Sequence, residues 1–233
     1  MTENIKIIYK NRNVVIINKP AGIPSQSDPT GDKDAMTLTS EMLASFGEPS
    51  ALWLVHRLDR TVGGLICFAR NKKSAAELSK TCSDGSMKKN YIAVCHGSAE
   101  GGEYCDLLFK DNATSKAYVV KTERKGAKEA RLIATPLEEK NDMTLVSVEL
   151  LTGRFHQIRA QMSSRGNSLV GDKKYGSRDP VARYPSLFAN AIAFELFGKK
   201  ISATALPDTT AYPWSKFDYF SKNETEERVD KNA

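Results

Sequence analysis

The sequence predicts an α+β protein, a single domain with a mostly antiparallel mixed sheet and a few flanking helices. Three observations lead to this fold class. Short runs rich in β-branched and aromatic residues recur along the 233-residue chain, and such runs are typical of strands. Several neighbouring runs are joined by short polar turns, which favours hairpins. Two segments have the apolar spacing of an amphipathic helix, a third ends at helix-stop signals, and the chain is long enough to bury a full core.

Ten runs are strand candidates. The first two enclose the turn signal Asn11–Asn13, another two enclose the charged turn 138–142, and the last two surround Gly198. Each of these pairs is therefore expected to form a hairpin. The segment 123–129 is too charged and too interrupted by glycine to be core. The expected strands cover residues 5–9, 14–18, 65–69, 89–96, 103–109, 117–121, 131–137, 143–151, 189–196 and 200–205.

The helix candidates cover residues 37–46, 72–82 and 155–164. The first ends before a glycine and a proline, and Asn71 can cap the second. No internal repeat or linker divides the chain, and residues 221–233 are polar and charged enough to form a disordered tail. The expected inner faces carry Ala75, Leu78, Ser79 and Cys82 in the second helix, and Phe155, Ile158 and Met162 in the third.

Arg159 lies within the apolar stripe of the third helix. At about 100° per residue it is only about 40° from Phe155. An arginine that faces the core needs an anionic partner, because an unpaired buried charge is very costly. Asp59 is the first carboxylate to consider. The alternative is a side chain that extends past the helix edge into solvent.

The composition is that of an ordinary globular protein. Hydrophobic residues make up 40% and charged residues 27% of the chain. No apolar run approaches the roughly 20 residues of a membrane helix, and Met1–Asn4 begins no signal-peptide pattern. We therefore expect a cytoplasmic protein without a membrane partner.

The basic residues are unevenly placed. The formal net charge of +6 is modest, but basic residues crowd near the candidate site, whereas acidic residues collect at 138–139 and in the tail. This asymmetry favours a nucleic-acid partner, and a solvated lysine-rich surface is the alternative. The crowded residues are Lys72, Lys73, Lys88, Lys89, Arg154, Arg159, Arg165, Lys173, Lys174, Arg178 and Arg183.

The cysteines and histidines predict no metal site. The four cysteines form no Cys-x-x-Cys pair, and Cys67 and Cys95 lie in apolar strand patterns, as expected for small core residues in a reducing compartment. The three histidines lack the spacing of zinc ligands. Neither standard glycine-rich phosphate loop is present.

Asp59 stands among three basic groups, His56, Arg57 and Arg60, in a loop between apolar runs. Such loops often carry catalytic residues, although ordinary surface ion pairs are the alternative. The following Gly63–Gly64 pair suits a tight turn or the close approach of a ligand backbone.

Four blocks together resemble the RluA-type pseudouridine synthases. They are Asn18–Gly22, His56–Asp59, Lys89–Ala93, and Leu151–Arg159 followed by Gly171–Gly176. Each block is weak alone, but their order along the chain is specific. The resemblance implies a pseudouridine synthase catalytic domain over residues 1–220. It also implies an isomerase that converts uridine in a structured rRNA or tRNA to pseudouridine by base flipping, with no metal or organic cofactor.

The resemblance also implies residue roles. Asp59 would be the nucleophile, Arg159 would pair with it and keep it ionised, and Tyr91 would stack on the base or assist proton transfer. Arg57 would fill the space that the flipped base leaves. Lys19, Arg154, Lys173 and Lys174 would bind phosphates. The full set of expected substrate contacts is His56, Arg57, Arg60, Lys19, Arg154, His156, Gln157, Lys173, Lys174 and Tyr175.

Some features depart from the family pattern or stay open. Val62–Gly64 stands where the family often has Thr-Ser-Gly, and Gln161 where a histidine often follows the last block. So few residues precede the first block that no N-terminal S4-like domain is expected. The sequence leaves open which uridine is modified, whether Asp59 attacks the ribose or the base, and the oligomeric state, with a monomer expected. The alternative is a catalytically silent RNA-binding protein of the same fold. A glycosidase would need a second carboxylate beside Asp59.

Overall fold

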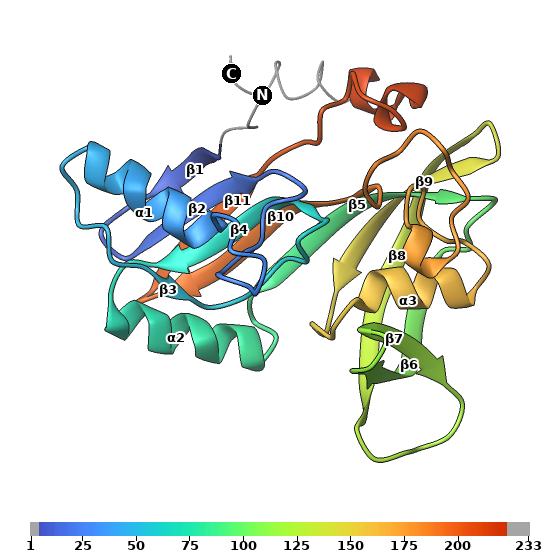
Figure 1. Ribbon diagram of the computed structural model, residues 1–233, viewed down its shortest axis with the longest axis horizontal. Coiled ribbons are helices and arrows are strands. Elements are labelled where there is room, and N and C mark those ends of the chain that lie inside the picture. Colours follow the sequence, from blue (N-terminus) through green and yellow to red (C-terminus); the bar gives the residue numbers. More distant parts are fainter. Residues whose placement is uncertain (1–4, 223–233) are drawn as a thin grey trace. The chain divides into compact units, whose positions relative to one another are not determined.

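The computed structural model describes residues 5–222, and the expected tail lies almost entirely outside them. The described chain divides into two compact units (Figure 1). The first unit comprises residues 5–91 and Leu187–Leu206, and the second comprises Ile92–Ser186 and residues 207–222. Within 5–222 no helix is both long and apolar enough to cross a membrane. The expected domain extent, 1–220, stays a prediction.

The first unit is built on a mixed sheet in the order β1-β2-β4-β10, with β3 beside β4 and β11 beside β10. All its pairings are antiparallel except β4 with β10. Every residue of β4 is buried, so both faces of this strand are covered. The strands are β1 (Lys6–Lys10), β2 (Val14–Lys19), β3 (Trp53–Leu54), β4 (Gly63–Ala69), β10 (Leu187–Leu196) and β11 (Lys199–Thr204).

Two capped helices belong to this unit. Asp34 caps α1 (Ala35–Ser45), and the predicted cap Asn71 is confirmed, because its side chain accepts the N–H of Ser74 at the start of α2 (Lys72–Ser83). Helix α2 packs on β4 and β10 through Leu78, which lies in a cluster of strand side chains (Figure 1). The predicted inner face of α2 is confirmed for Ala75, Leu78 and Cys82, which pack in that cluster, but Ser79 is exposed. The buried residues are Ser74, Leu78 and Thr81.

The second unit is a sheet in the order β5-β9-β8-β6-β7, with α3 packed on β6 and β7 (Figure 1). Its first strand begins in the first unit. The pairings of β8 with β9, β8 with β6 and β6 with β7 are antiparallel. The elements are β5 (Lys88–His96), β6 (Gly102–Asp111), β7 (Lys116–Val120), β8 (Ala127–Lys140), β9 (Met143–Leu150), α3 (Gln157–Ser164) and the 3-10 helices η1 (Lys173–Tyr175) and η2 (Trp214–Lys216).

The structure confirms the α+β class, the mostly antiparallel pairing and the three predicted hairpins. It also confirms that Cys67 and Cys95 are buried and unbonded. Helix α3 begins two residues later than predicted, because His156 adopts a left-handed conformation with φ of 51° and so cannot continue the helix toward its N-terminus.

Gly64 is required by the sheet itself. Its φ is +114°, and a Cβ placed there would lie 2.4 Å from the backbone oxygen of Ala189 in β10. The close approach expected at Gly63–Gly64 is therefore that of a neighbouring strand, and no ligand is needed to explain it. The parallel contact between β4 and β10 depends on this glycine.

His56 anchors the loop before β4. Its Nε2 accepts the backbone N–H of Cys67 at 3.0 Å, so the ring must be neutral to keep this bond. Burial, together with the positive charge of Lys89, lowers the pKa of His56 to about 3. His56 therefore works as an uncharged hydrogen-bond acceptor inside the first unit, and its expected substrate contact stays a prediction.

We predict that Gly64→Ala destabilises the protein by more than about 2 kcal/mol, because left-handed strain adds to a backbone clash. Gly198→Ala is the matched control, since Gly198 has φ of +74° but a Cβ added there would have no atom within 4 Å. That variant should lose about 1 kcal/mol. Urea unfolding followed by circular dichroism measures both. Equal losses in the two variants would show that the close approach of β10 is unimportant.

We predict that His56 makes the protein acid-sensitive. In the unfolded chain His56 takes up a proton near pH 6.5, whereas the folded protein resists protonation down to about pH 3. The unfolded state therefore binds more protons in this window, and stability falls as the pH drops below 6.5, by about 1.4 kcal/mol per pH unit at most.

His56→Gln tests this prediction. The glutamine amide oxygen can accept the Cys67 N–H at every pH, so its stability should fall less than that of the wild type between pH 7.5 and pH 4.5. Free energies of urea unfolding at the two pH values give the comparison, and carboxylates common to both proteins cancel in the difference. Parallel losses would mean that His56 does not titrate as expected.

Candidate active site

The backbone around Asp59 is fixed from both sides. The hydroxyl of Ser25 donates to the Leu58 carbonyl at 2.8 Å and accepts the Leu58 N–H at 3.1 Å. After Asp59, the N–H of Val62 donates to the Asp59 carbonyl at 3.0 Å, and the N–H of Gly22 donates to the Arg60 carbonyl at 2.7 Å. The carboxylate is thus carried on a turn whose conformation is set by the 22–25 loop.

Lys19 is fully buried beneath this turn. Its Nζ donates to the carbonyls of Pro20 at 3.0 Å, Ile23 at 2.8 Å and Arg60 at 3.4 Å. An ammonium group has three N–H donors, and all three are used. Lys19 therefore ties the Pro20–Ile23 turn to the backbone that follows Asp59, and its expected phosphate contact stays a prediction.

Burial lowers the pKa of Lys19 to about 7, and the negative charge of Asp59 opposes this shift. Tyr91 on β5 is only 7% exposed. Burial raises the pKa of its phenol well above the usual range, and the charge of Asp59 raises it further. The carboxylate thus acts on both neighbours within the first unit, which places Asp59 and Tyr91 in one electrostatic environment.

Arg60 stabilises a loop. Its Nε donates to the Gly22 carbonyl at 2.9 Å and its Nη1 to the hydroxyl of Thr30 at 2.9 Å. Its guanidinium also pairs with Asp32, and with Asp28 at 3.6 Å. Because two carboxylates already balance its charge, Arg60 is better explained as the residue that closes the 28–32 loop than as the expected RNA contact. Arg57 is exposed and stays a candidate contact.

Arg159 is buried in the second unit, as predicted, and it has an anionic partner. Its Nε and Nη2 donate to the two carboxylate oxygens of Asp172 at 2.7 and 2.8 Å, and both side chains are almost wholly buried. This bidentate arrangement fixes the plane of the guanidinium. Sequence reasoning missed Asp172, although it stands in the fourth block. The pairing of Arg159 with Asp59 stays a prediction.

Gln157 is a structural residue in the second unit. Its side-chain oxygen accepts from the Thr152 hydroxyl at 2.8 Å and the Arg154 N–H at 2.9 Å, and its amide donates to the Arg131 carbonyl at 3.0 Å. The side chain is 3% exposed, and the expected RNA contact by Gln157 stays a prediction. Arg154 is exposed, with only its Nε bound, to the Glu129 carbonyl at 2.8 Å, and stays a candidate phosphate contact.

Tyr175 also has a structural role, and its expected substrate contact stays a prediction. Its buried hydroxyl accepts the N–H of Ala117 at 2.7 Å and lies 2.9 Å from Nδ1 of His156. Burial, with the nearby charges of Arg159 and Lys174, lowers the pKa of His156 to about 3, so this ring is neutral and can accept from the phenol. Lys173 and Lys174 are exposed and stay candidate contacts.

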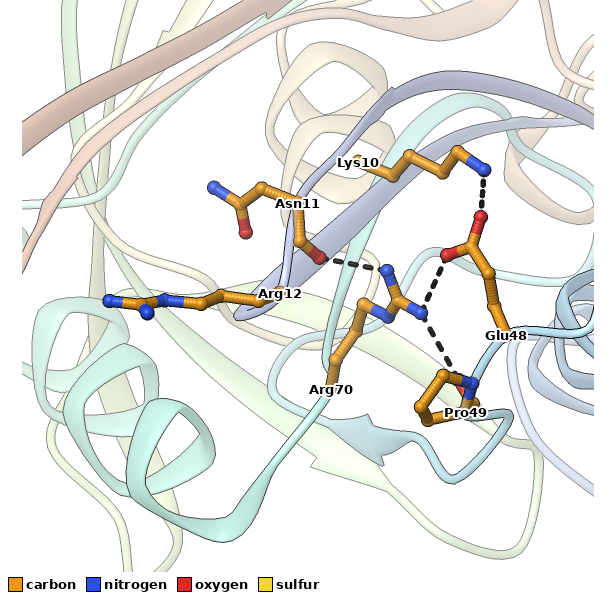
Figure 2. Close-up of a pocket in the computed structure, with 6 residues that line it drawn as sticks. All are labelled: Lys10, Asn11, Arg12, Glu48, Pro49 and Arg70. Carbon is orange, nitrogen blue, oxygen red and sulfur yellow. Dashed lines mark hydrogen bonds and ion pairs between the residues drawn. The ribbon is translucent and has the colours of Figure 1, made fainter.

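A surface hollow of the first unit surrounds Arg70, which follows the last residue of β4 (Figure 2). In it, Arg70 donates to the Asn11 carbonyl at 2.9 Å and to Glu48 at 2.8 Å, and Glu48 also pairs with Lys10. Asp59 lies before the first residue of β4, at the other end of this seven-residue strand, and is not among the residues that line the hollow. This hollow is therefore separate from the Asp59 site.

Comparison with known proteins places the chain in a family. A model of the family described as RNA pseudouridylate synthase matches residues 13–164. The chain is 28% identical to an uncharacterized RNA pseudouridine synthase of Haemophilus influenzae, over 94% of each protein. It is 29% identical to ribosomal large subunit pseudouridine synthase C of Rickettsia bellii, over 85% of this chain and 67% of that one.

Two solved human structures share the fold. RNA pseudouridylate synthase domain containing 4 matches with a TM-score of 0.74 and 20% identity, over 87% of this chain and 89% of that one. RNA pseudouridylate synthase domain containing 1 matches with a TM-score of 0.75 and 20% identity, over 92% and 87%. The predicted resemblance is confirmed: this chain belongs to the RNA pseudouridylate synthase family, the isomerases that convert uridine in RNA to pseudouridine.

Proposed function

We propose that Asp59 is the nucleophile with which this chain isomerises a uridine of folded rRNA or tRNA. One observation carries the assignment: Asp59 is the carboxylate whose charge acts on the buried phenol of Tyr91, on a turn fixed by Lys19 and Ser25. A nucleophile must be ionised and correctly oriented. A turn whose backbone is hydrogen-bonded on both sides of Asp59 fixes that orientation. The ribosomal relative from Rickettsia bellii supports rRNA as a substrate.

The reaction is a rearrangement in which nothing is added or lost. The bond between N1 of uracil and C1′ of ribose breaks, and a bond between C5 and C1′ forms. The proton on C5 leaves and N1 carries a proton in the product. One carboxylate can serve this chemistry by attacking either C1′ of the ribose or C6 of the base, and both remain open for Asp59.

Tyr91 would act on the base as a neutral phenol. The raised pKa, caused by burial and by the charge of Asp59, keeps its hydroxyl protonated at neutral pH. A protonated phenol can stack through its ring or donate a hydrogen bond, but it is a poor base. We therefore assign Tyr91 to stacking on the uracil or to donating a proton, and not to removing the proton from C5.

A uridine within a stem or loop must leave its stack to reach a side chain on a protein turn. Arg57 is exposed and adjacent to Asp59, so it can occupy the space that the base leaves. Its guanidinium can stack on neighbouring bases while its charge offsets that of the phosphates. Arg154, Lys173 and Lys174 would contact phosphates, which position RNA without reading its sequence.

Arg159 would pair with Asp59 through the donors that Asp172 does not use. A guanidinium has five N–H groups, and Asp172 accepts from one on Nε and one on Nη2. The others can reach a second acceptor in the plane that Asp172 sets. Action as a cytoplasmic monomer without metal or organic cofactor remains a prediction from the sequence.

The rival function is RNA binding without catalysis. Such a protein would bind RNA but would form no pseudouridine. Purified protein is incubated with rRNA and tRNA transcripts in which uridine is tritiated at carbon 5, and tritium released to water is counted. Binding without release would establish the rival function, whereas release from one transcript would establish the activity and identify the RNA.

We predict that Asp59→Asn lowers the rate of tritium release by roughly three orders of magnitude or more, because an amide is not a nucleophile. RNA affinity should be retained, since the side chain keeps its size. Asp84→Asn is the matched control, because Asp84 is a turn carboxylate of the same unit that bonds to Ser86, which asparagine can also do. Residual turnover near the wild-type level in Asp59→Asn would remove Asp59 from the chemistry.

We predict that Asp172, and not Asp59, provides most of the charge balance of Arg159. Asp172→Ala should destabilise the protein by about 3–5 kcal/mol, the usual cost of stranding one member of a buried ion pair. Asp59→Ala should cost clearly less, because Asp172 remains. Arg159→Met in the Asp172→Ala background should recover part of the loss, with a coupling energy of about 1–3 kcal/mol.

Urea unfolding of the single and double variants gives these free energies. Tritium release from the same proteins shows whether the orientation of Arg159 matters for catalysis. If it does, Asp172→Ala should also slow turnover. Additive losses for Asp172→Ala and Arg159→Met would contradict the coupling. A cost for Asp59→Ala equal to that for Asp172→Ala would show that Arg159 depends on both carboxylates.

A further inference from the structure

Two lysines of the β6–β7 hairpin lie over aromatic rings of the second unit. The Nζ of Lys110 is 4.7 Å from the ring centre of Phe155, whose ring stacks on His156 at 3.8 Å. The Nζ of Lys116 is 5.0 Å from the ring centre of Tyr175, which contacts His156 edge-on. We call Lys110, Lys116, Phe155, His156 and Tyr175 the hairpin–ring surface.

The strand register places Lys110, and the contact with Tyr175 places Lys116, which pairs with Asp111 across the hairpin. Lys110 pairs with Ala117 across the hairpin, and it follows the buried Leu108 by two residues, so the two side chains share a face of the strand. That face packs on the region of Ala160 and Phe155 at α3. The hairpin is therefore tied to the rings by a small core, which holds both ammonium groups at its edge.

The two lysines of the hairpin–ring surface form no ion pair among the described residues, and the nearest acid in the strand register is Asp111, opposite Lys116. Among residues 5–222, neither Lys110 nor Lys116 has an acidic side chain within ion-pairing distance, and the same holds for Lys174. By contrast, Lys33 pairs with Glu41, and Lys140 with Asp218. The positive charges of Lys174 and Lys110 also contribute to the lowered pKa of His156, so both charges act on this ring.

We propose that the hairpin–ring surface binds the phosphate backbone of the substrate RNA, with Lys110 and Lys116 each contacting a phosphate. The inference rests on the proposed function for the identity of the RNA. Unpaired lysines gathered at one place bind phosphates with release of counterions. Their contacts with the rings limit the freedom of the long side chains, so less entropy is lost when RNA binds. The family blocks in the sequence do not include either lysine.

The test replaces both lysines with methionine, which keeps an unbranched stem over the rings and removes the charge. The matched control is Lys199→Met with Lys200→Met, two exposed lysines of β11 without an acidic partner among the described residues. Both double variants lower the net charge equally. Binding of a fluorescein-labelled RNA hairpin with a uridine-rich loop is measured by anisotropy at several salt concentrations.

We expect Lys110→Met with Lys116→Met to weaken binding about tenfold at low salt and to reduce the slope of log affinity against log salt by about 1.4 to 1.8, as two lost phosphate contacts require. The loss of tritium release should appear mainly in KM. The control pair should bind as the wild type does. Lys110→Arg with Lys116→Arg should restore affinity, because the charge is kept.

An unchanged affinity and salt slope would overturn the proposal, and so would an equal loss in the control pair. If the double variant unfolds at lower urea concentration, the single Lys110→Met variant is used, with half the change in slope expected. Failure of the proposed function is a separate result: wild-type protein would then release no tritium, while its RNA affinity could still depend on Lys110 and Lys116.

Discussion

The hydrogen bonds of one buried ammonium group set the conformation on which the Asp59 site depends. Lys19 donates to three backbone carbonyls, one of which belongs to the residue after Asp59. A buried lysine is costly unless its donors are satisfied. The turn at Pro20–Ile23 and the turn at Asp59 must therefore both close around the same nitrogen. The chemistry proposed for Asp59 relies on a contact that is itself inaccessible to RNA.

The charge of Asp59 has opposite consequences for its two neighbours. It stabilises the ammonium of Lys19, so the pKa falls only to about 7, and it disfavours ionisation of Tyr91, so that phenol stays protonated. One carboxylate thereby keeps a cation beneath it and a neutral ring beside it. The proposed stacking on uracil uses a neutral ring. An ionised phenol beside Asp59 would be repelled by that carboxylate.

The sequence predicted the strands, hairpins and helices well, because their signals are local: alternation, turn residues and caps such as Asn71. It predicted the site less evenly. His56, Arg60 and Lys19 were assigned as basic contacts to RNA. The type of a residue does not reveal whether it is buried or which groups it binds. Lys19 bonds to a carbonyl 41 residues away, and such contacts exist only after folding. Arg159 was the exception, since helical spacing placed it in the core, yet its partner Asp172 belongs to a separate turn.

The basic residues available for RNA are those that carboxylates and carbonyls of the protein do not already hold in place. Arg60 and Arg70 are held by carboxylates, Arg159 by Asp172, and Lys19 by carbonyls. The cations left exposed without an acidic partner among the described residues include Arg57, Arg154, Lys173 and Lys174. A net charge of +6 is modest, but phosphates respond to local charge, which is highest where protein carboxylates are missing. Lys110 and Lys116 likewise form no ion pair among the described residues, although they lie outside the blocks that carry the family resemblance.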